Sequence, residues 1–127
     1  MQKAATLRTV FLFLLALFFV FAGLNHFRDP GFYLAMMPPQ LPWHRELVAL
    51  SGVFEVIGGV LVLVPPLRRL TGWGLIALLI AVFPANIYAA VAHVQPPGEH
   101  IAPILLWLRL PFQVLFIAWV HWVAVRR

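Results

Sequence analysis

Glu55 is the one acidic residue inside a long apolar segment of this chain, within Ser51-Gly52-Val53-Phe54-Glu55-Val56. A charged side chain at membrane depth costs roughly 2.5–3.5 kcal/mol on insertion scales unless it is paired, protonated or hydrated. Arg109 is the one basic residue deep in another apolar segment. Each lies about eight residues from one end of its predicted helix, about 12 Å deep at 1.5 Å per residue. The matching depth predicts a Glu55–Arg109 ion pair.

Further polar side chains are expected in the same half of the molecule. Every predicted helix contributes to this polar cluster, which adds Asn25, His26, Ser51, Asn86 and Gln113 to the charged pair. The other half is almost purely apolar. Two interpretations stay open, because such residues either hold a membrane bundle together or form a ligand or proton site.

The histidines and tryptophans raise the question of a cofactor. His26 and His93 lie at the same predicted level, where two histidines could ligate haem or a metal ion. No His-x-x-His or Glu-x-x-His pair accompanies them, so we do not expect haem or metal, and a quinone remains the candidate cofactor. Packing or interfacial roles are favoured over a quinone site for four tryptophans: Trp73, Trp107, Trp119 and Trp122. Without a nucleophile, thiol or metal motif, we do not expect a stand-alone enzyme.

The composition is that of an integral membrane protein. Of the 127 residues, 63% are hydrophobic and only 10% are charged, with a mean hydropathy of +0.94, whereas soluble domains are about 45–50% apolar and about 25% charged. The net charge is +5, but the basic residues lie at segment ends, which indicates membrane topology and not nucleic-acid binding. The absence of cysteine excludes disulfides and thiol catalysis within the chain.

The apolar residues fall into four blocks, which predicts a single all-α membrane domain over residues 1–127. A cleaved signal peptide is the competing interpretation for the first block, but its apolar part is long for one. The loop between the first two helices, residues 28–46, contains the turn Asp29-Pro30-Gly31. The predicted helices cover residues 9–27, 47–64, 71–93 and 101–125.

Charged residues in the connections predict the orientation. The termini and the second connection hold Lys3, Arg8, Arg68, Arg69, Arg126 and Arg127. The other two connections hold only Arg28 and Arg45. The positive-inside rule then places both termini in the cytoplasm, and the helices form an up-down-up-down bundle.

A series of small residues on the third predicted helix is a candidate contact surface. Ala77, Ala81, Ala85 and Ala89 recur every four residues. Small side chains at this spacing allow another helix to approach closely.

Several short motifs in this order resemble the DoxX family of small bacterial membrane proteins. They are Asn25-His26-Phe27, Met36-Met37-Pro38-Pro39, Ser51-Gly52-Val53-Phe54-Glu55 with Gly58-Gly59, Arg68-Arg69, Phe83-Pro84-Ala85-Asn86 and Arg109-Leu110-Pro111-Phe112-Gln113. The resemblance implies a multi-pass, four-helix protein of the bacterial inner membrane. Relatives include a subunit of thiosulfate:quinone oxidoreductase, and the family is grouped with the redox-associated MauE proteins. The fold also resembles the core of vitamin K epoxide reductases, but their cysteine chemistry does not carry over to a chain without cysteine.

We therefore expect an accessory, partner-binding subunit of a redox or stress-response membrane assembly. The alternative is a small-molecule or quinone-binding protein that uses the polar cluster, and this alternative predicts a cavity reaching Glu55. Transport is the weaker third hypothesis, because four helices leave little room for alternating access unless the chain forms a homo-oligomer. The expected partners are the lipid bilayer and membrane or redox proteins, with no nucleic acid.

Overall fold

The computed structural model describes residues 2–126, and all regular structure within them is helical. Four long helices are joined by short helical pieces and loops: α1 (Gln2–Arg28), α2 (Pro30–Ala35), α3 (His44–Leu61), the 3₁₀ turn η1 (Pro65–Leu67), α4 (Arg68–Val91), α5 (Pro103–Val120) and the π-helical turn η2 (His121–Val125). The expectation of an all-α protein is confirmed.

The helix boundaries differ from the predicted ones for local reasons. α1 begins at Gln2 instead of residue 9, because residues 2–8 are mostly good helix formers and continue the helix beyond the apolar block. α3 begins at His44 and ends at Leu61, before Pro65. Val64 is extended, as expected for the residue that precedes a proline. The loop 28–46 contains α2. This helix begins after Asp29, with Pro30 in its first turn, where proline is favoured.

Among residues 2–126, three segments are long and apolar enough to cross a membrane, which indicates a membrane protein. They are Gln2–Arg28, Pro65–Val91 and Pro103–Val125. α3 is not among these three, and its 18 residues include the charged Arg45, Glu46 and Glu55. Many large apolar side chains are exposed on the helices, among them Phe21 and Leu70. Such apolar surfaces are suited to contact with lipid.

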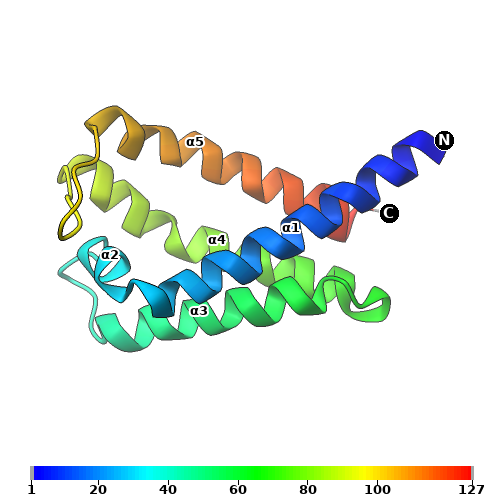
Figure 1. Cartoon of the computed structure of the whole chain (residues 1–127), viewed down its shortest axis with the longest axis horizontal. Coiled ribbons are helices and arrows are strands. Elements are labelled where there is room, and N and C mark those ends of the chain that lie inside the picture. Colours follow the sequence, from blue (N-terminus) through cyan, green and yellow to red (C-terminus); the bar gives the residue numbers. More distant parts are fainter. Residues whose placement is uncertain (1, 127) are drawn as a thin grey trace.

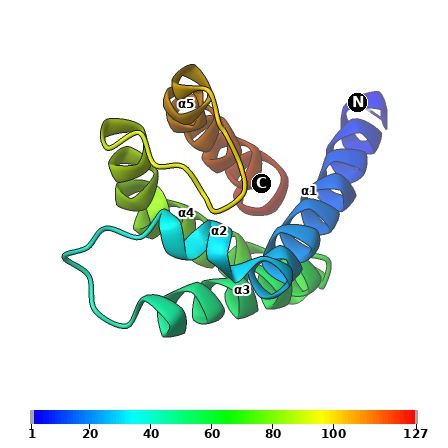
Figure 2. The same cartoon turned by 60° about the vertical axis from the view of Figure 1, so that its left-hand side comes forward.

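The long helices are arranged in two pairs, α1 with α3 and α4 with α5 (Figure 1). The pairs come together at the end of the molecule that contains η1 and η2, which we call the closed end. They diverge toward the end that contains α2 and the connection 92–102, which we call the loop end (Figures 1 and 2). At the closed end, the Arg8 guanidinium donates a hydrogen bond to the Arg126 carbonyl.

Packing is concentrated at the closed end. The main core joins α1, α4, α5 and η2 around fully buried Leu15, Phe19 and Val120. A second, smaller core at the loop end places Met36, just after α2, against Ala89, Ala90 and Leu106. The core thus fixes the closed end and leaves the space between the pairs less filled toward the loop end.

Glycines bring α1 and α3 into close contact. A Cβ on Gly23 would lie 2.6 Å from the Gly52 carbonyl oxygen, and one on Gly59 would lie 2.8 Å from the Ala16 carbonyl oxygen. The two helix backbones therefore approach through these glycines, as small residues permit in membrane helices. The predicted alanine series does not play this role inside the chain, because Ala77 and Ala81 are exposed and only Ala89 is buried.

Candidate functional site

A cavity of about 920 Å³ lies between the two helix pairs, and residues from α1, α2, α3, α4 and α5 line it. This volume is near the upper end of the roughly 300–1,000 Å³ typical of small-molecule sites. Most of its wall is apolar, with Phe19, Leu79 and Phe116 among the lining side chains. We call this cavity the cleft. Its size and apolar wall suit an apolar molecule.

The cleft gathers most of the polar residues singled out in the sequence. Six of the seven lie on its wall: His26, Ser51, Glu55, Asn86, Arg109 and Gln113. Asn25 is not part of the wall, but it contacts Tyr33, which lines the cleft. The helix rise predicts a common level for these side chains, and the fold arranges them around one cavity.

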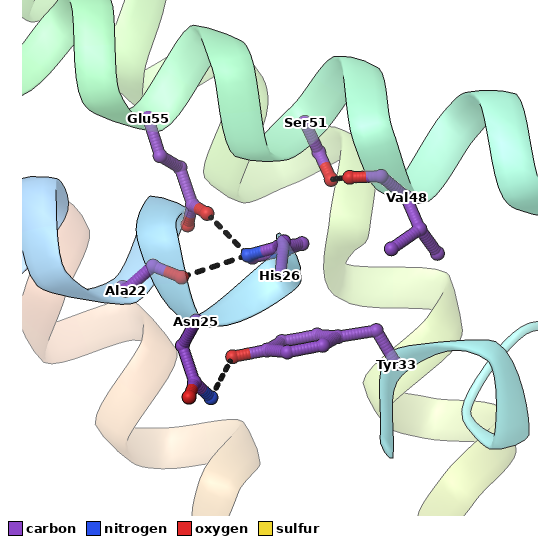
Figure 3. Close-up of polar contacts among 7 residues, drawn as sticks. All are labelled: Ala22, Asn25, His26, Tyr33, Val48, Ser51 and Glu55. Atoms are coloured by element: carbon purple, nitrogen blue, oxygen red, sulfur yellow. Dashed lines mark hydrogen bonds and ion pairs between the residues drawn. The ribbon is translucent and has the colours of Figure 1, made fainter. Parts of the chain in front are cut away.

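The predicted Glu55–Arg109 ion pair is not formed. Within residues 2–126, the side chain that pairs with Glu55 is His26, whose Nδ1 lies 3.1 Å from Glu55 Oε2 (Figure 3). Both side chains are largely buried. The helix rise predicts the same level for Glu55 and Arg109 but does not determine which helices pack together. Because the Gly23–Gly52 contact holds α3 against α1, the neighbour of Glu55 comes from α1.

His26 Nδ1 also lies 2.8 Å from the Ala22 carbonyl oxygen (Figure 3). A carbonyl oxygen only accepts hydrogen bonds, so Nδ1 carries the ring proton and donates a hydrogen bond to the Ala22 carbonyl. Glu55 Oε2 is close enough for an ion pair, but it has no aligned hydrogen bond among the described residues. We therefore treat the Glu55–His26 contact as electrostatic, with one carboxylate oxygen left open to a further donor.

Arg109 makes weak contacts with the α2 region in place of an ion pair. Its Nη1 lies 3.6 Å from Met36 Sδ, and its guanidinium carbon lies 5.9 Å from the centre of the Phe32 ring. A thioether is a weak acceptor, and a single aromatic ring contributes about 0.5–2 kcal/mol. Most of the donors of this guanidinium are thus unused by the described part of the chain.

The amides of Asn86 and Gln113 bind each other across α4 and α5. Asn86 Nδ2 donates to Gln113 Oε1, and Gln113 Nε2 donates to the Leu79 carbonyl. Leu79 immediately precedes Ile80, whose carbonyl has no helical donor because Pro84, four residues later, lacks an N–H group. Ser51 is similarly engaged within its own helix, because its hydroxyl donates to the Val48 carbonyl at 3.0 Å.

Sequence reasoning did not assign α2 to the site. Tyr33 stacks on His26, with ring centres 3.8 Å apart, and its hydroxyl accepts a hydrogen bond of 2.8 Å from Asn25 Nδ2 (Figure 3). Burial raises the pKa of Tyr33 above its usual value, so the phenol stays neutral near neutral pH. The sequence feature that indicates this contact is the Asp29-Pro30-Gly31 turn. A reversal of the chain at this turn brings residues 32–36 back over the end of α1.

Together the fold and the site define an all-helical membrane protein with a polar-lined cleft between two helix pairs. Residues 15–124 match the family described as a domain of unknown function (DUF8561), and the chain belongs to this family. The match runs from the middle of α1 into η2 and therefore includes the whole cleft wall. No curated protein and no solved structure matches the chain.

Proposed function

We propose that this protein binds a small, largely apolar molecule in the cleft. The observation that carries the proposal is a cavity of about 920 Å³ with an apolar wall and a few convergent polar groups. This combination characterises ligand sites in proteins. A purely structural polar cluster would favour side chains that satisfy one another, but Arg109 and Glu55 Oε2 keep unused hydrogen-bonding capacity.

Access from the bilayer is part of this proposal. Exposed Leu50, Phe54 and Phe112 lie on the rim of the cleft, and they belong to different helix pairs. An apolar molecule dissolved in lipid meets these side chains before it meets water. A quinone belongs to this class of molecule, and so does a lipid chain.

The membrane arrangement that goes with this site is the up-down-up-down bundle with both termini in the cytoplasm. It is supported by the basic residues at the closed end, including Arg8, Arg68 and Arg69, and by the alternating course of the four long helices in Figure 1. The loop end then faces the outside of a bacterial inner membrane.

A photoreactive probe tests the proposed site. Purified protein in lipid nanodiscs is irradiated with a neutral long-chain alcohol that carries a diazirine, and mass spectrometry locates the labelled peptides. We expect labelling of cleft residues and a drop of about tenfold in Ala85→Trp, because this half-buried alanine lines the cleft and a large ring there fills it.

Ala77→Trp is the matched control. Ala77 lies two turns away on the same helix, exposed and outside the cleft wall, so its labelling should equal that of the wild type. Labelling spread evenly over the lipid-facing helix surfaces, with no loss in Ala85→Trp, would show that the cleft is not a binding site.

The accessory-subunit hypothesis is the second candidate, and the resemblance to the DoxX family and its redox relatives belongs with it. It is favoured by Ala77, a small and exposed side chain on α4 outside the cleft wall, where a partner helix could approach closely. Here Ala77→Phe should release a stoichiometric partner from the complex purified out of native membranes. Purification of the wild type as free protein alone would count against this candidate.

A further inference from the structure

We propose that the ligand of the cleft is an amphiphile with an anionic head, a carboxylate or a phosphate, on an apolar chain, and that Arg109 binds the head. This inference rests on the proposed function and names its ligand class. The geometry that carries it is a guanidinium on the wall of an apolar cleft without an acidic partner.

The first step is the unmet charge of Arg109. Within residues 2–126, no carboxylate oxygen lies within 4.0 Å of the guanidinium, and its contacts are Met36 Sδ and the Phe32 ring. Neither neutralises the charge. An arginine at this depth is costly without an anion or water, and its planar set of donors matches a carboxylate or a phosphate.

The second step is that the other polar side chains of the cleft contact groups other than Arg109. Glu55 lies against His26, and Asn86 and Gln113 bind each other and the Leu79 carbonyl. The Glu55 carboxyl thus lies on the α1–α3 pair, while Arg109 lies on α5. An anion from outside the chain is the missing partner on the Arg109 side.

The third step is the direction of the cleft. Arg109 contacts the α2 region, at the loop end, whereas Phe19 and Phe116 line the cleft near the core of the closed end. From Arg109 to Phe116 along α5 is about 10 Å at 1.5 Å per residue. A head bound at Arg109 therefore has an apolar path for its chain toward the closed end. The chain then runs from the loop end toward the closed end, as the chain of a lipid in the loop-end leaflet does.

A neutral ligand fits this arrangement less well. The head of a quinone offers carbonyl acceptors to Arg109 but brings no charge, so the cation would remain without a counter-ion in an apolar cleft. Charge complementarity therefore favours the anionic amphiphile.

Matched probes test the inference in nanodiscs of zwitterionic lipid. An anthroyl-labelled long-chain carboxylic acid and the alcohol with the same chain and label are titrated against wild type, Arg109→Gln and Arg109→Lys. We expect the wild type to bind the acid at least tenfold more tightly than the alcohol. Arg109→Gln should abolish this preference by weakening the acid alone, and Arg109→Lys should keep part of it.

Controls and competitors identify the source of the effect. Arg69→Gln removes an exposed positive charge at the closed end and should leave both affinities unchanged. Competition by oleic acid or by lysophosphatidic acid, each against its uncharged counterpart oleyl alcohol or monooleoylglycerol, shows whether the carboxylate or the phosphate head is preferred.

The outcomes separate the two proposals. If neither probe binds above the level of empty nanodiscs, the proposed function itself is overturned. If both probes bind equally and Arg109→Gln changes nothing, the cleft binds ligands but Arg109 does not select an anion, and this inference is overturned. Should Arg109→Gln fail to fold by circular dichroism and gel filtration, the ratio of the two wild-type affinities decides, and a ratio near one overturns the inference.

Discussion

At the scale of single residues, His26 connects three parts of the site. Its Nδ1 faces the Ala22 carbonyl and Glu55, and its ring stacks on Tyr33 (Figure 3). Asn25, one residue earlier, fixes the Tyr33 hydroxyl and in turn accepts a hydrogen bond from Arg28 Nε at 2.8 Å. The position of Glu55 in the cleft thus depends on a histidine that the Ala22 carbonyl and the Tyr33 ring hold in place.

These contacts predict energetic coupling between Glu55 and His26. In a double-mutant cycle with Glu55→Gln and His26→Gln, we expect the two losses in free energy of unfolding to be non-additive by about 1 kcal/mol, since residues in contact couple by roughly 0.5–3 kcal/mol. The measurement is reversible unfolding in mixed detergent micelles, followed by circular dichroism.

The matched cycle combines Glu55→Gln with Arg109→Gln. These side chains form no ion pair in the structure, so their effects should add to within about 0.5 kcal/mol. Strong coupling in this cycle and none in the first would show that Glu55 pairs with Arg109 after all.

At the scale of the elements, the contact between α1 and α3 positions half of the site. Gly52 lies on α3 about one turn before Glu55, and a Cβ at Gly52 would lie 2.8 Å from His26 Cβ. The same close contact that joins the helices therefore brings Glu55 to His26. Arg68 completes the end of α3, where its Nε donates to the Val62 carbonyl at 2.8 Å. This basic residue thus has a structural role besides its contribution to topology.

A glycine substitution tests this helix contact. Gly23→Ala should lower the free energy of unfolding by about 1–3 kcal/mol, because the new methyl group meets the backbone of α3, which cannot move aside as a side chain can. The unfolding assay in detergent micelles measures this loss.

Gly74→Ala is the control, since a Cβ at Gly74 meets no atom within 4 Å. It should be neutral or stabilise α4 by up to about 1 kcal/mol, as alanine is the better helix former. Equal losses in the two variants would mean that the contact between α1 and α3 is looser than the structure describes.

At the scale of the whole molecule, the two ends differ in both chemistry and packing. The closed end is a filled apolar core, and the loop end encloses the cleft under α2. The basic residues Arg8, Arg68, Arg69 and Arg126 lie at the closed end, because Arg8 donates to the Arg126 carbonyl and α4 begins with Arg68 and Arg69 directly after η1. The proposed topology therefore puts the filled end toward the cytoplasm and the cleft toward the outside.

Single cysteines test this topology directly, because the native chain has none. In intact bacterial cells, a membrane-impermeant maleimide should label a cysteine at Glu99, in the loop-end connection, several-fold more than a cysteine at Arg69. Permeabilisation should make the two signals equal. Both residues are exposed, so a difference in burial does not explain the contrast, and the reverse pattern would invert the proposed orientation.

The sequence by itself determined the class of protein and the level of its polar residues. Apolar blocks of nearly membrane-spanning length predict long helices, and prolines and glycines mark their ends, so the helices could be located to within a few residues at most boundaries. Counting residues along each helix placed Glu55, Asn86 and Arg109 at a similar depth, which is a property of the helix rise alone.

Only the tertiary structure decided which of these residues meet. In a membrane helix the faces toward lipid and toward other helices are both apolar, so the sequence pattern does not show which helices pack together. The glycine contacts between α1 and α3 direct Glu55 to His26, and the divergence of the helix pairs leaves Arg109 on the far wall of a cleft. Depth is a local property of each helix, whereas partners and cavities depend on how the helices pack.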